Sequence, residues 1–167
     1  MNLFIRKALP SDAPEICEMV RTAFAEYAAM VGAADLPALH ETLEATLQDI
    51  RDKRVLIGFV NRTKAVGTVR YEILPGNIAY ISRFAILQAW QQCGMGKALI
   101  AQVEQECREQ GVAAIALHTG AKLTSQVHFY YANGFYIHAT DTQRGYIRGL
   151  FLKELQPGVP LDLSAIL

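Results

Sequence analysis

The spacing of hydrophobic positions changes several times along the chain, and each change predicts a new element. Over the first half, alternating or continuous apolar runs indicate strands, whereas apolar residues three and four positions apart indicate helices. The predicted elements are a strand at Leu3–Lys7, a helix capped by Ser11 or Asp12 and interrupted at Gly32, a second helix at Leu36–Ile50, and strands at Val55–Asn61, Ala65–Leu74 and Ile78–Leu87. Turns with asparagine, proline and glycine join the three strands, so we expect an antiparallel meander.

The second half alternates helices and strands. The run Val112–His118 is apolar on both of its alternating faces, which is typical of a central strand. Around it we expect a helix at Gly96–Gln110, a short helix from Thr124 to Asn133, strands at Phe135–Ala139 and Tyr146–Leu155, and a tail at Gln156–Leu167. This order predicts one α+β domain over residues 1–167, built on a mixed sheet.

Charge and cysteine content narrow the classes of partner. Sixteen basic and sixteen acidic residues cancel in the 167-residue chain, so it lacks the positive charge by which proteins bind nucleic acid or an anionic membrane. No apolar run approaches the ~20 residues of a membrane span, and Arg6 and Lys7 interrupt any signal-peptide layout. Three scattered cysteines favour reduced thiols in a cytoplasm. His40, His128 and His138 have no metal-ligand spacing.

The segment between the strand at Ile78–Leu87 and the next helix carries the main chemical signal. Gly94 and Gly96 open that helix, and its first acidic residue is Glu104. The first N–H groups of a helix have no partner within the helix, and the helix dipole adds partial positive charge there. Glycine lets a phosphate approach these groups closely. The segment therefore predicts an anion site; glycine used only for close helix packing is the alternative.

Spacing separates this motif from two other phosphate-binding patterns. A Walker A loop needs glycine at position 91 and Ser or Thr at position 98, where the chain has Gln91 and Ala98. A dinucleotide fingerprint needs a third glycine near position 99, which is Leu99. What remains is Gln-x-x-Gly-x-Gly at positions 91, 94 and 96.

A second motif, Phe129-Tyr130-Tyr131-Ala132-Asn133-Gly134-Phe135, follows one strand later. Together with Phe84-Ala85-Ile86-Leu87 and the glycine motif, it resembles the GNAT superfamily of acyl-CoA-dependent N-acetyltransferases, most closely over residues 80–135. That family has a strand ending Leu-Ala-Val-x-Pro, then Gln/Arg-x-x-Gly-x-Gly/Ala, then Phe-Tyr-x-x-x-Gly-Phe. The resemblance implies a mixed, mostly antiparallel central sheet flanked by helices and splayed between its fourth and fifth strands.

The resemblance also implies acetyl-CoA as the cosubstrate and no metal. The pyrophosphate would bind backbone N–H groups of residues 92–97, and the pantetheine arm would lie along the preceding strand, one of whose N–H groups would polarise the thioester carbonyl. The implied cofactor-binding residues are Phe84, Ala85, Ile86, Gln91, Gln92, Cys93, Gly94, Met95, Gly96, Lys97, Ser125 and Tyr130. Two positions depart from the family: Gln88 replaces a proline, and Leu123 replaces an asparagine whose pantetheine contact Ser125 could supply.

Tyr130 matches the general acid of the family, which protonates the departing coenzyme A thiolate. Proton transfer from a tyrosine with a pKa near 10 to a thiolate whose thiol has a pKa near 8.5 is unfavourable by about 1.5 pKa units, or roughly 2 kcal/mol. Either the pKa of Tyr130 is lowered in place, or its hydroxyl stabilises the thiolate by a hydrogen bond. The alternative is that Tyr130 is a core residue like Phe129.

A base is harder to assign from the sequence. Family members often place glutamate just before the position of Phe84, where this chain has Ser82 and Arg83. His118 and Glu72 remain as base candidates, although each also fits a structural role, and proton removal through water is the favoured prediction.

The resemblance places the acceptor against the first two helices and the last strand, so Glu26, Tyr27, Asp35 and Tyr146 are candidate walls. We expect an N-acetyltransferase acting on a primary amine of a small molecule, peptide or protein. The alternative functions are a non-catalytic acyl-CoA-binding or sensor module and, more remotely, a phosphate-binding protein unrelated to coenzyme A. A homodimer through terminal strands is a further expectation.

Overall fold

The computed structural model describes residues 1–167, and its elements follow the predicted order. They are β1 (Leu3–Lys7), α1 (Ala13–Val31), α2 (Leu43–Asp52), β2 (Arg54–Val60), β3 (Lys64–Leu74), β4 (Ile78–Ile86), α3 (Met95–Glu109), β5 (Ala114–Gly120), α4 (Thr124–Ala132), β6 (Tyr136–Asp141) and β7 (Arg148–Glu154), with short 3-10 turns at Pro10–Asp12, Pro37–His40 and Gln88–Trp90.

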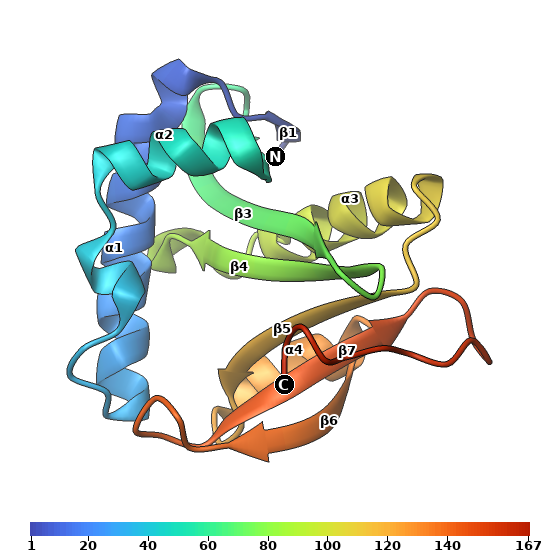
Figure 1. Cartoon of the computed structure of the whole chain (residues 1–167). Helices are drawn as coiled ribbons and strands as arrows, with labels where there is room; N and C mark the ends of the chain where they lie inside the picture. Colours follow the sequence, from blue (N-terminus) through green and yellow to red (C-terminus); the bar gives the residue numbers. More distant parts are fainter.

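All seven strands form one sheet in the order β1-β2-β3-β4-β5-β7-β6. Only the β4–β5 pair is parallel, and every other neighbouring pair is antiparallel. Helices α1 and α2 cover one face, and α3 and α4 cover the other (Figure 1). The predicted mixed, mostly antiparallel α+β fold is confirmed.

The parallel pair is short, and this shortness shapes the molecule. Only Ile78–Tyr80 of β4 pairs with β5, opposite Ala114–Ala116. Beyond these residues the two strands diverge, with β4 continuing to Ile86 and β5 to Gly120 (Figure 1). The edge of β4 that faces β5 therefore carries backbone groups with no strand partner. We call this region the splay, and it confirms the expected divergence of the fourth and fifth strands.

Apolar side chains from both faces of the sheet form the core. The largest cluster joins the sheet to α3 and α4 through residues such as Leu99, Val103 and Phe151. On the other face, Ile16 and Val20 of α1 pack over the β2 side. The C-terminal tail covers the remaining part of that face, where Leu163 packs among residues of β4, β5 and β7.

The second helix differs from its prediction. The sequence suggests one helix over Leu36–Ile50, but a 3-10 turn ends at His40 and α2 begins only at Leu43. Pro37 starts the 3-10 turn, where its missing N–H is tolerated. Thr42 then caps α2 by accepting a hydrogen bond from the N–H of Ala45 at 3.0 Å. The break leaves Glu41 between the two segments.

The start of α1 also differs in detail. Asp12 is at the N-cap position, but its carboxylate caps no N–H of the helix. It accepts hydrogen bonds from the N–H of Leu9 at 2.7 Å and from the Arg6 guanidinium at 2.7 and 3.0 Å instead. A charged partner and a nearer N–H thus compete successfully with the helix end for this carboxylate.

Candidate active site

The N-terminus of α3 has free backbone donors. Gly94 is the N-cap residue with φ of 90°, a conformation that favours glycine. No side chain caps the helix and its first turn has no acidic residue. The N–H groups of Met95, Gly96 and Lys97 make no hydrogen bond, and the first bond into the turn is donated by Ala98 to the carbonyl of Gly94 at 3.0 Å. These three N–H groups have no partner in the protein, so they can donate to an anion such as a phosphate.

The turn before α3 contributes fewer donors than its sequence suggests. The N–H of Gln91 bonds to the carbonyl of Gln88 at 3.3 Å, and the N–H of Cys93 bonds to the carbonyl of Trp90 at 3.2 Å. Both bonds stabilise the turn itself. The side chains of Gln91, Gln92 and Lys97 are exposed beside it, whereas Met95 is fully buried and can offer only its backbone.

Strand β4 lies directly beside this helix end. A Cβ atom placed on Gly96 would lie 3.5 Å from the Phe84 ring and 3.4 Å from the Phe129 ring. These are ordinary van der Waals distances, so Gly96 lies where α3, β4 and α4 meet, with room for a methyl group. Ala85 and Ile86 pair with β3 on one side only, opposite Thr68 and Gly67. Their other edge borders the splay, as does that of Phe84.

Tyr130 projects from α4 into the aromatic core beside this region. It is 6% exposed and packs against the rings of Phe129, Phe135 and Phe151. Its hydroxyl has no hydrogen-bond partner in the protein, and burial raises the pKa of Tyr130 well above its ordinary value. The hydroxyl is therefore protonated at neutral pH. Because its proton is held more tightly than in water, this group is better suited to donate a hydrogen bond than to give up its proton.

The start of α4 lies just after the end of β5. Leu123 occupies the N-cap position without a capping side chain, and Ser125 in the first turn is exposed. No hydrogen bond occupies the Ser125 hydroxyl within the protein. Ser125 is thus free to serve the role that the sequence suggested for it.

His118 and Tyr80 meet across the narrow end of the splay. Tyr80 is the last residue of β4 that pairs with β5, and its hydroxyl lies 2.6 Å from Nδ1 of His118. Nε2 of His118 lies 4.0 Å from Asp141, whose carboxylate is held by Arg148 at 2.8 and 3.1 Å. Burial and the Arg148 charge lower the pKa of His118 to about 4. His118 is therefore neutral at physiological pH. No local sequence pattern marks Tyr80 or Asp141 as its neighbours.

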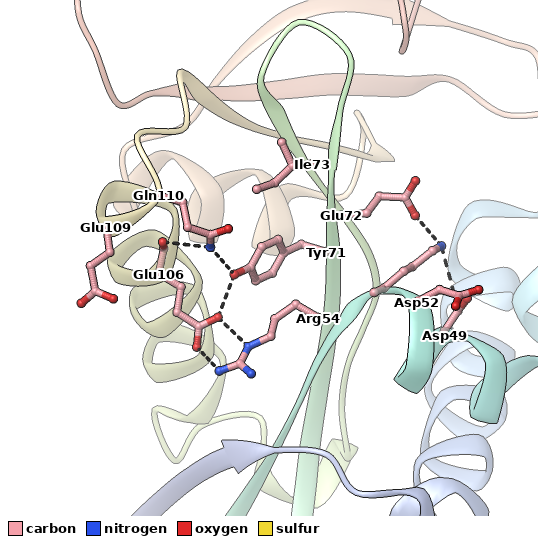
Figure 2. Close-up of a pocket in the computed structure, with 10 residues that line it drawn as sticks. Asp49, Asp52, Arg54, Tyr71, Glu72, Ile73, Glu106, Glu109 and Gln110 are labelled. Atoms are coloured by element: carbon pink, nitrogen blue, oxygen red, sulfur yellow. Dashed lines mark hydrogen bonds and ion pairs between the residues drawn. The ribbon is translucent and has the colours of Figure 1, made fainter.

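Glu72 lies elsewhere. Its carboxylate forms an ion pair with Lys53 at 2.9 Å, and Lys53 also approaches Asp49 at 3.7 Å, so Glu72 is tied to the end of α2. The residue lines a depression of about 840 Å³ between α2, β3 and the C-terminal half of α3 (Figure 2). The structure does not bring Glu72 to the splay.

The same depression contains a polar network that involves α3. Glu106 receives two hydrogen bonds from Arg54, at 2.9 and 2.8 Å, and one from the Tyr71 hydroxyl at 2.7 Å (Figure 2). Gln110 donates to the Tyr71 hydroxyl at 3.3 Å. Burial would raise the pKa of Glu106, but its hydrogen bonds, first that from Arg54, outweigh burial and hold the pKa below its ordinary value. The hydrogen-bonding capacity of Glu106 is therefore taken up by Arg54 and Tyr71 within the protein.

Two of the four suggested acceptor walls come together. The Tyr27 hydroxyl lies 2.9 Å from the Tyr146 hydroxyl and accepts a hydrogen bond from the N–H of Gly120 at 2.9 Å. These contacts attach α1 to the end of β5 and to the loop between β6 and β7. Asp35 instead pairs with His40 at 2.6 Å at an exposed position. Glu26 lies on α1, half-buried and with no ion pair.

No helix of the protein has the length and hydrophobicity to cross a membrane. No group of three or more His, Cys, Asp or Glu side chains is arranged to hold a metal ion.

Comparison with protein families identifies the fold. Residues 17–135 match the model of the acetyltransferase (GNAT) family. The chain belongs to the GNAT acetyltransferase family. The resemblance inferred from the sequence motifs is thereby confirmed, and the matched segment includes both the glycine turn and Tyr130. A Bacillus subtilis (strain 168) protein named as an acetyltransferase is 36% identical over 53 residues, which cover 32% of this chain and 35% of that protein.

Solved GNAT structures share the fold over nearly the whole chain. The PaiA N-acetyltransferase of Thermoplasma acidophilum, in complex with coenzyme A, superposes with a TM-score of 0.79 at 21% identity, covering 92% of this chain and 99% of that one. YncA of Salmonella typhimurium, with its cofactor acetyl-CoA, gives 0.77 at 17% identity over 97% and 99%. The ribosomal-protein-S18-alanine N-acetyltransferase of Escherichia coli gives 0.72 at 15% identity over 92% and 94%.

Within this GNAT fold, one contact of β4 joins two segments that lie far apart in the sequence. Arg83 of β4 has φ of 50°, in the left-handed region, and its guanidinium lies 3.2 Å from the buried carboxylate of Glu41. The two residues are 42 positions apart, and no local pattern marks either of them.

Proposed function

We propose that this protein is an N-acetyltransferase that transfers an acetyl group from acetyl-CoA directly to a primary amine of a small molecule, peptide or protein. The observation that carries the proposal is the set of free N–H groups at Met95, Gly96 and Lys97, placed beside the free edge of β4. Membership of the GNAT family supports it, as do the related folds that hold coenzyme A or acetyl-CoA.

The proposed cosubstrate site follows from these donors. The pyrophosphate binds at the N-terminus of α3, where the helix dipole contributes roughly 0.3–2 kcal/mol. The amide-rich pantetheine arm lies along Phe84, Ala85 and Ile86 in place of the missing strand. A β4 N–H then polarises the thioester carbonyl. Gln91, Gln92 and Cys93 shape the turn, and Ser125 supplies a polar contact near α4.

The proposed reaction is a direct displacement. The neutral amine attacks the thioester carbonyl, a C–N bond forms, and the C–S bond breaks. The departing thiolate receives a hydrogen bond from Tyr130, whose raised pKa favours this role, and full protonation can follow from solvent. The proton of the amine leaves through water. His118 is neutral and close to the splay, and its Nε2 can accept a hydrogen bond from that water when its Nδ1–H donates to the Tyr80 hydroxyl. Glu72 is instead occupied by Lys53.

We also propose a location for the protein in the cell. Cys17, Cys93 and Cys107 are all free thiols, which supports a reducing, cytoplasmic location. A homodimer through terminal strands stays a prediction; β1 and β6 are the two edge strands of the sheet.

Calorimetric titration with acetyl-CoA tests the proposal. We expect micromolar binding that Gly94→Trp abolishes, followed by free-thiol release when a suitable amine is supplied. Binding without thiol release across a broad amine screen would instead favour the non-catalytic acyl-CoA-binding module. Absence of binding by the folded protein would refute the acetyltransferase proposal, and tight ATP binding with no response to coenzyme A would favour an unrelated phosphate-binding function.

A further inference from the structure

Strand β4 contains an irregularity at the point where it borders the splay. Ser82 pairs with Arg70 and Ala85 pairs with Thr68, so two β4 residues, Arg83 and Phe84, lie opposite one β3 residue. This is a β-bulge, and its first residue has the left-handed φ of 50° at Arg83. A non-glycine residue keeps that conformation only when its surroundings impose it.

The bulge determines which way β4 presents its side chains. Arg83 turns toward the face covered by α1 and α2, where Glu41 lies, while Phe84 packs against Phe129 on the face covered by α3 and α4. One extra residue in a strand resets the alternation of side chains and of N–H groups beyond it. The conformation of Arg83 therefore sets the direction of the free N–H groups in the segment Phe84–Ile86.

Glu41 is the partner that holds Arg83. The carboxylate of Glu41 is 3% exposed and contacts the Arg83 guanidinium, the Thr46 hydroxyl at 2.8 Å and the fully buried Arg70 guanidinium. Burial alone would raise the pKa of Glu41, but the hydrogen bond and charge of Arg70, with smaller effects of Thr46 and Arg83, hold the pKa below its ordinary value. Glu41 is thus a charged anchor at neutral pH.

The backbone of Glu41 is fixed as firmly as its side chain. Its carbonyl accepts hydrogen bonds from Arg21 of α1 at 2.6 Å and from the Cys17 thiol at 3.4 Å. Residue 41 lies in the break between the 3-10 turn and α2. The anchor is therefore held by α1, by α2 and by the core of β3 at once.

We propose that Glu41 is a positioning residue that clamps Arg83 in its left-handed conformation and so aims the free N–H groups of β4 at the thioester carbonyl. The proposal rests on the acetyltransferase function proposed above. The ion pair between Glu41 and Arg83 would thus affect catalysis, although Glu41 lies outside the proposed cofactor site. Family members often carry a strand carboxylate just before the Phe84 position; here a buried carboxylate from another segment binds the arginine that stands there.

Asp49 provides a matched control. Its carboxylate also binds Arg70, at 2.8 Å, but makes no contact with Arg83. Asp49→Asn removes the charge of one of the two carboxylates that bind the buried Arg70. The contact between Glu41 and Arg83 stays in place. A purely structural role for the charge cluster predicts the same behaviour for Glu41→Gln and Asp49→Asn, whereas the clamp predicts a difference.

Two measurements separate these cases. The first is hydrogen–deuterium exchange of peptides that cover residues 82–86, and the second is acetyl-CoA-dependent thiol release with the best amine from the screen. We expect Glu41→Gln and Arg83→Met to speed exchange in this segment and to lower kcat at least tenfold. The Kd for acetyl-CoA should rise by a smaller factor than kcat falls, because the pyrophosphate site is intact. Asp49→Asn should lower Tm but leave both readouts near wild type.

A rescue variant tests the conformational part of the proposal. Glycine adopts a left-handed φ without strain, so Arg83→Gly should recover at least threefold of the kcat that Arg83→Met loses. Equal kcat for these two variants, or equal effects of Glu41→Gln and Asp49→Asn on exchange and kcat, would overturn the clamp. If wild-type protein fails to bind acetyl-CoA, the proposed function is refuted, yet the exchange comparison still decides whether Glu41 holds the bulge.

Discussion

The two ends of α3 treat their polar groups in opposite ways. At the N-terminus, Met95, Gly96 and Lys97 present N–H groups with no partner, and no side chain competes for them. Toward the C-terminus, Glu106 is surrounded by donors and binds Arg54 and Tyr71 (Figure 2). The backbone donors at the N-terminal end thus lack partners, whereas the carboxylate near the C-terminal end has several.

This difference shows why size and polarity are poor guides to a binding site. The depression at the C-terminal end is large and rich in charge, but both of its basic residues are already held in ion pairs, Lys53 with Glu72 and Arg54 with Glu106. A ligand there would have to replace good hydrogen bonds within the protein. At the N-terminal end a ligand only adds bonds, so the free energy of binding is not spent on breaking existing ones.

The strongest test of this contrast exchanges a glycine at each end. Gly94 and Gly111 both have positive φ, of 90° and 69°, and neither would meet a close contact through an added Cβ. Gly94→Trp and Gly111→Trp should each lower the free energy of unfolding by about 1–3 kcal/mol through backbone strain. Only Gly94→Trp should lower acetyl-CoA affinity, by more than about a thousandfold, as measured by calorimetry. A similar loss of affinity in Gly111→Trp would contradict a site at the N-terminal end.

Tyr130 offers a second test because it lies beside the N-terminal end. Tyr130→Phe removes only the hydroxyl, so we expect kcat to fall by about 100-fold, the lower range for loss of one hydrogen-bond donor to developing charge, while the Kd for acetyl-CoA changes less than threefold. Tyr131→Phe, which alters a half-exposed neighbour, is the control. Unchanged kcat in Tyr130→Phe would show that the phenol serves only the core.

His118 permits a test by pH. Its pKa is about 4 in the folded protein and about 6.5 in an unfolded chain. The unfolded chain therefore binds a proton at a higher pH, so stability from the neutral imidazole is fully present above pH 6.5 and is lost as the pH falls toward 4. The loss should reach about 2–3 kcal/mol. Chemical denaturation of His118→Asn at several pH values should show a flatter profile between pH 6.5 and 4 than wild type; parallel profiles would refute this contribution.

We expect the smallest effect for a substitution of Glu106, near the C-terminal end of α3. Glu106→Gln replaces a carboxylate that accepts charged hydrogen bonds, so the free energy of unfolding should fall by about 1–2 kcal/mol. Acetyl-CoA affinity should not change, because the network lies at the far end of α3. Urea denaturation and calorimetry on the same variant measure both quantities. A marked loss of affinity would mean that the depression takes part in cofactor binding after all.

The order of helices and strands could be predicted because burial is encoded in local spacing. The strand at Val112–His118, apolar on both faces, is indeed central as β5, and Gly94 and Gly96 do open α3. The break at Glu41 was missed although Pro37 offered a signal, since the apolar spacing continues through it. Local patterns thus predicted elements well, but not where two of them divide.

The site was predictable only where its chemistry depends on neighbouring residues. The free donors of α3 follow from a glycine pattern within a few positions. The pairs Glu41–Arg83 and Tyr80–His118 join residues 42 and 38 positions apart, and either member alone resembles an ordinary polar residue. Such contacts exist only after the sheet has assembled.

The tyrosine pair at the end of α1 has a consequence for how the protein is made. Tyr27 contacts Gly120 and Tyr146, which follow it by 93 and 119 residues. Contacts between such distant parts of a chain form slowly, because the intervening loop must close first. A nascent chain that has released α1 from the ribosome must wait for almost the whole remaining sequence before α1 can close over the end of β5. This closure therefore comes late in synthesis, and a chain stopped before Tyr146 cannot make the contact between the two tyrosines.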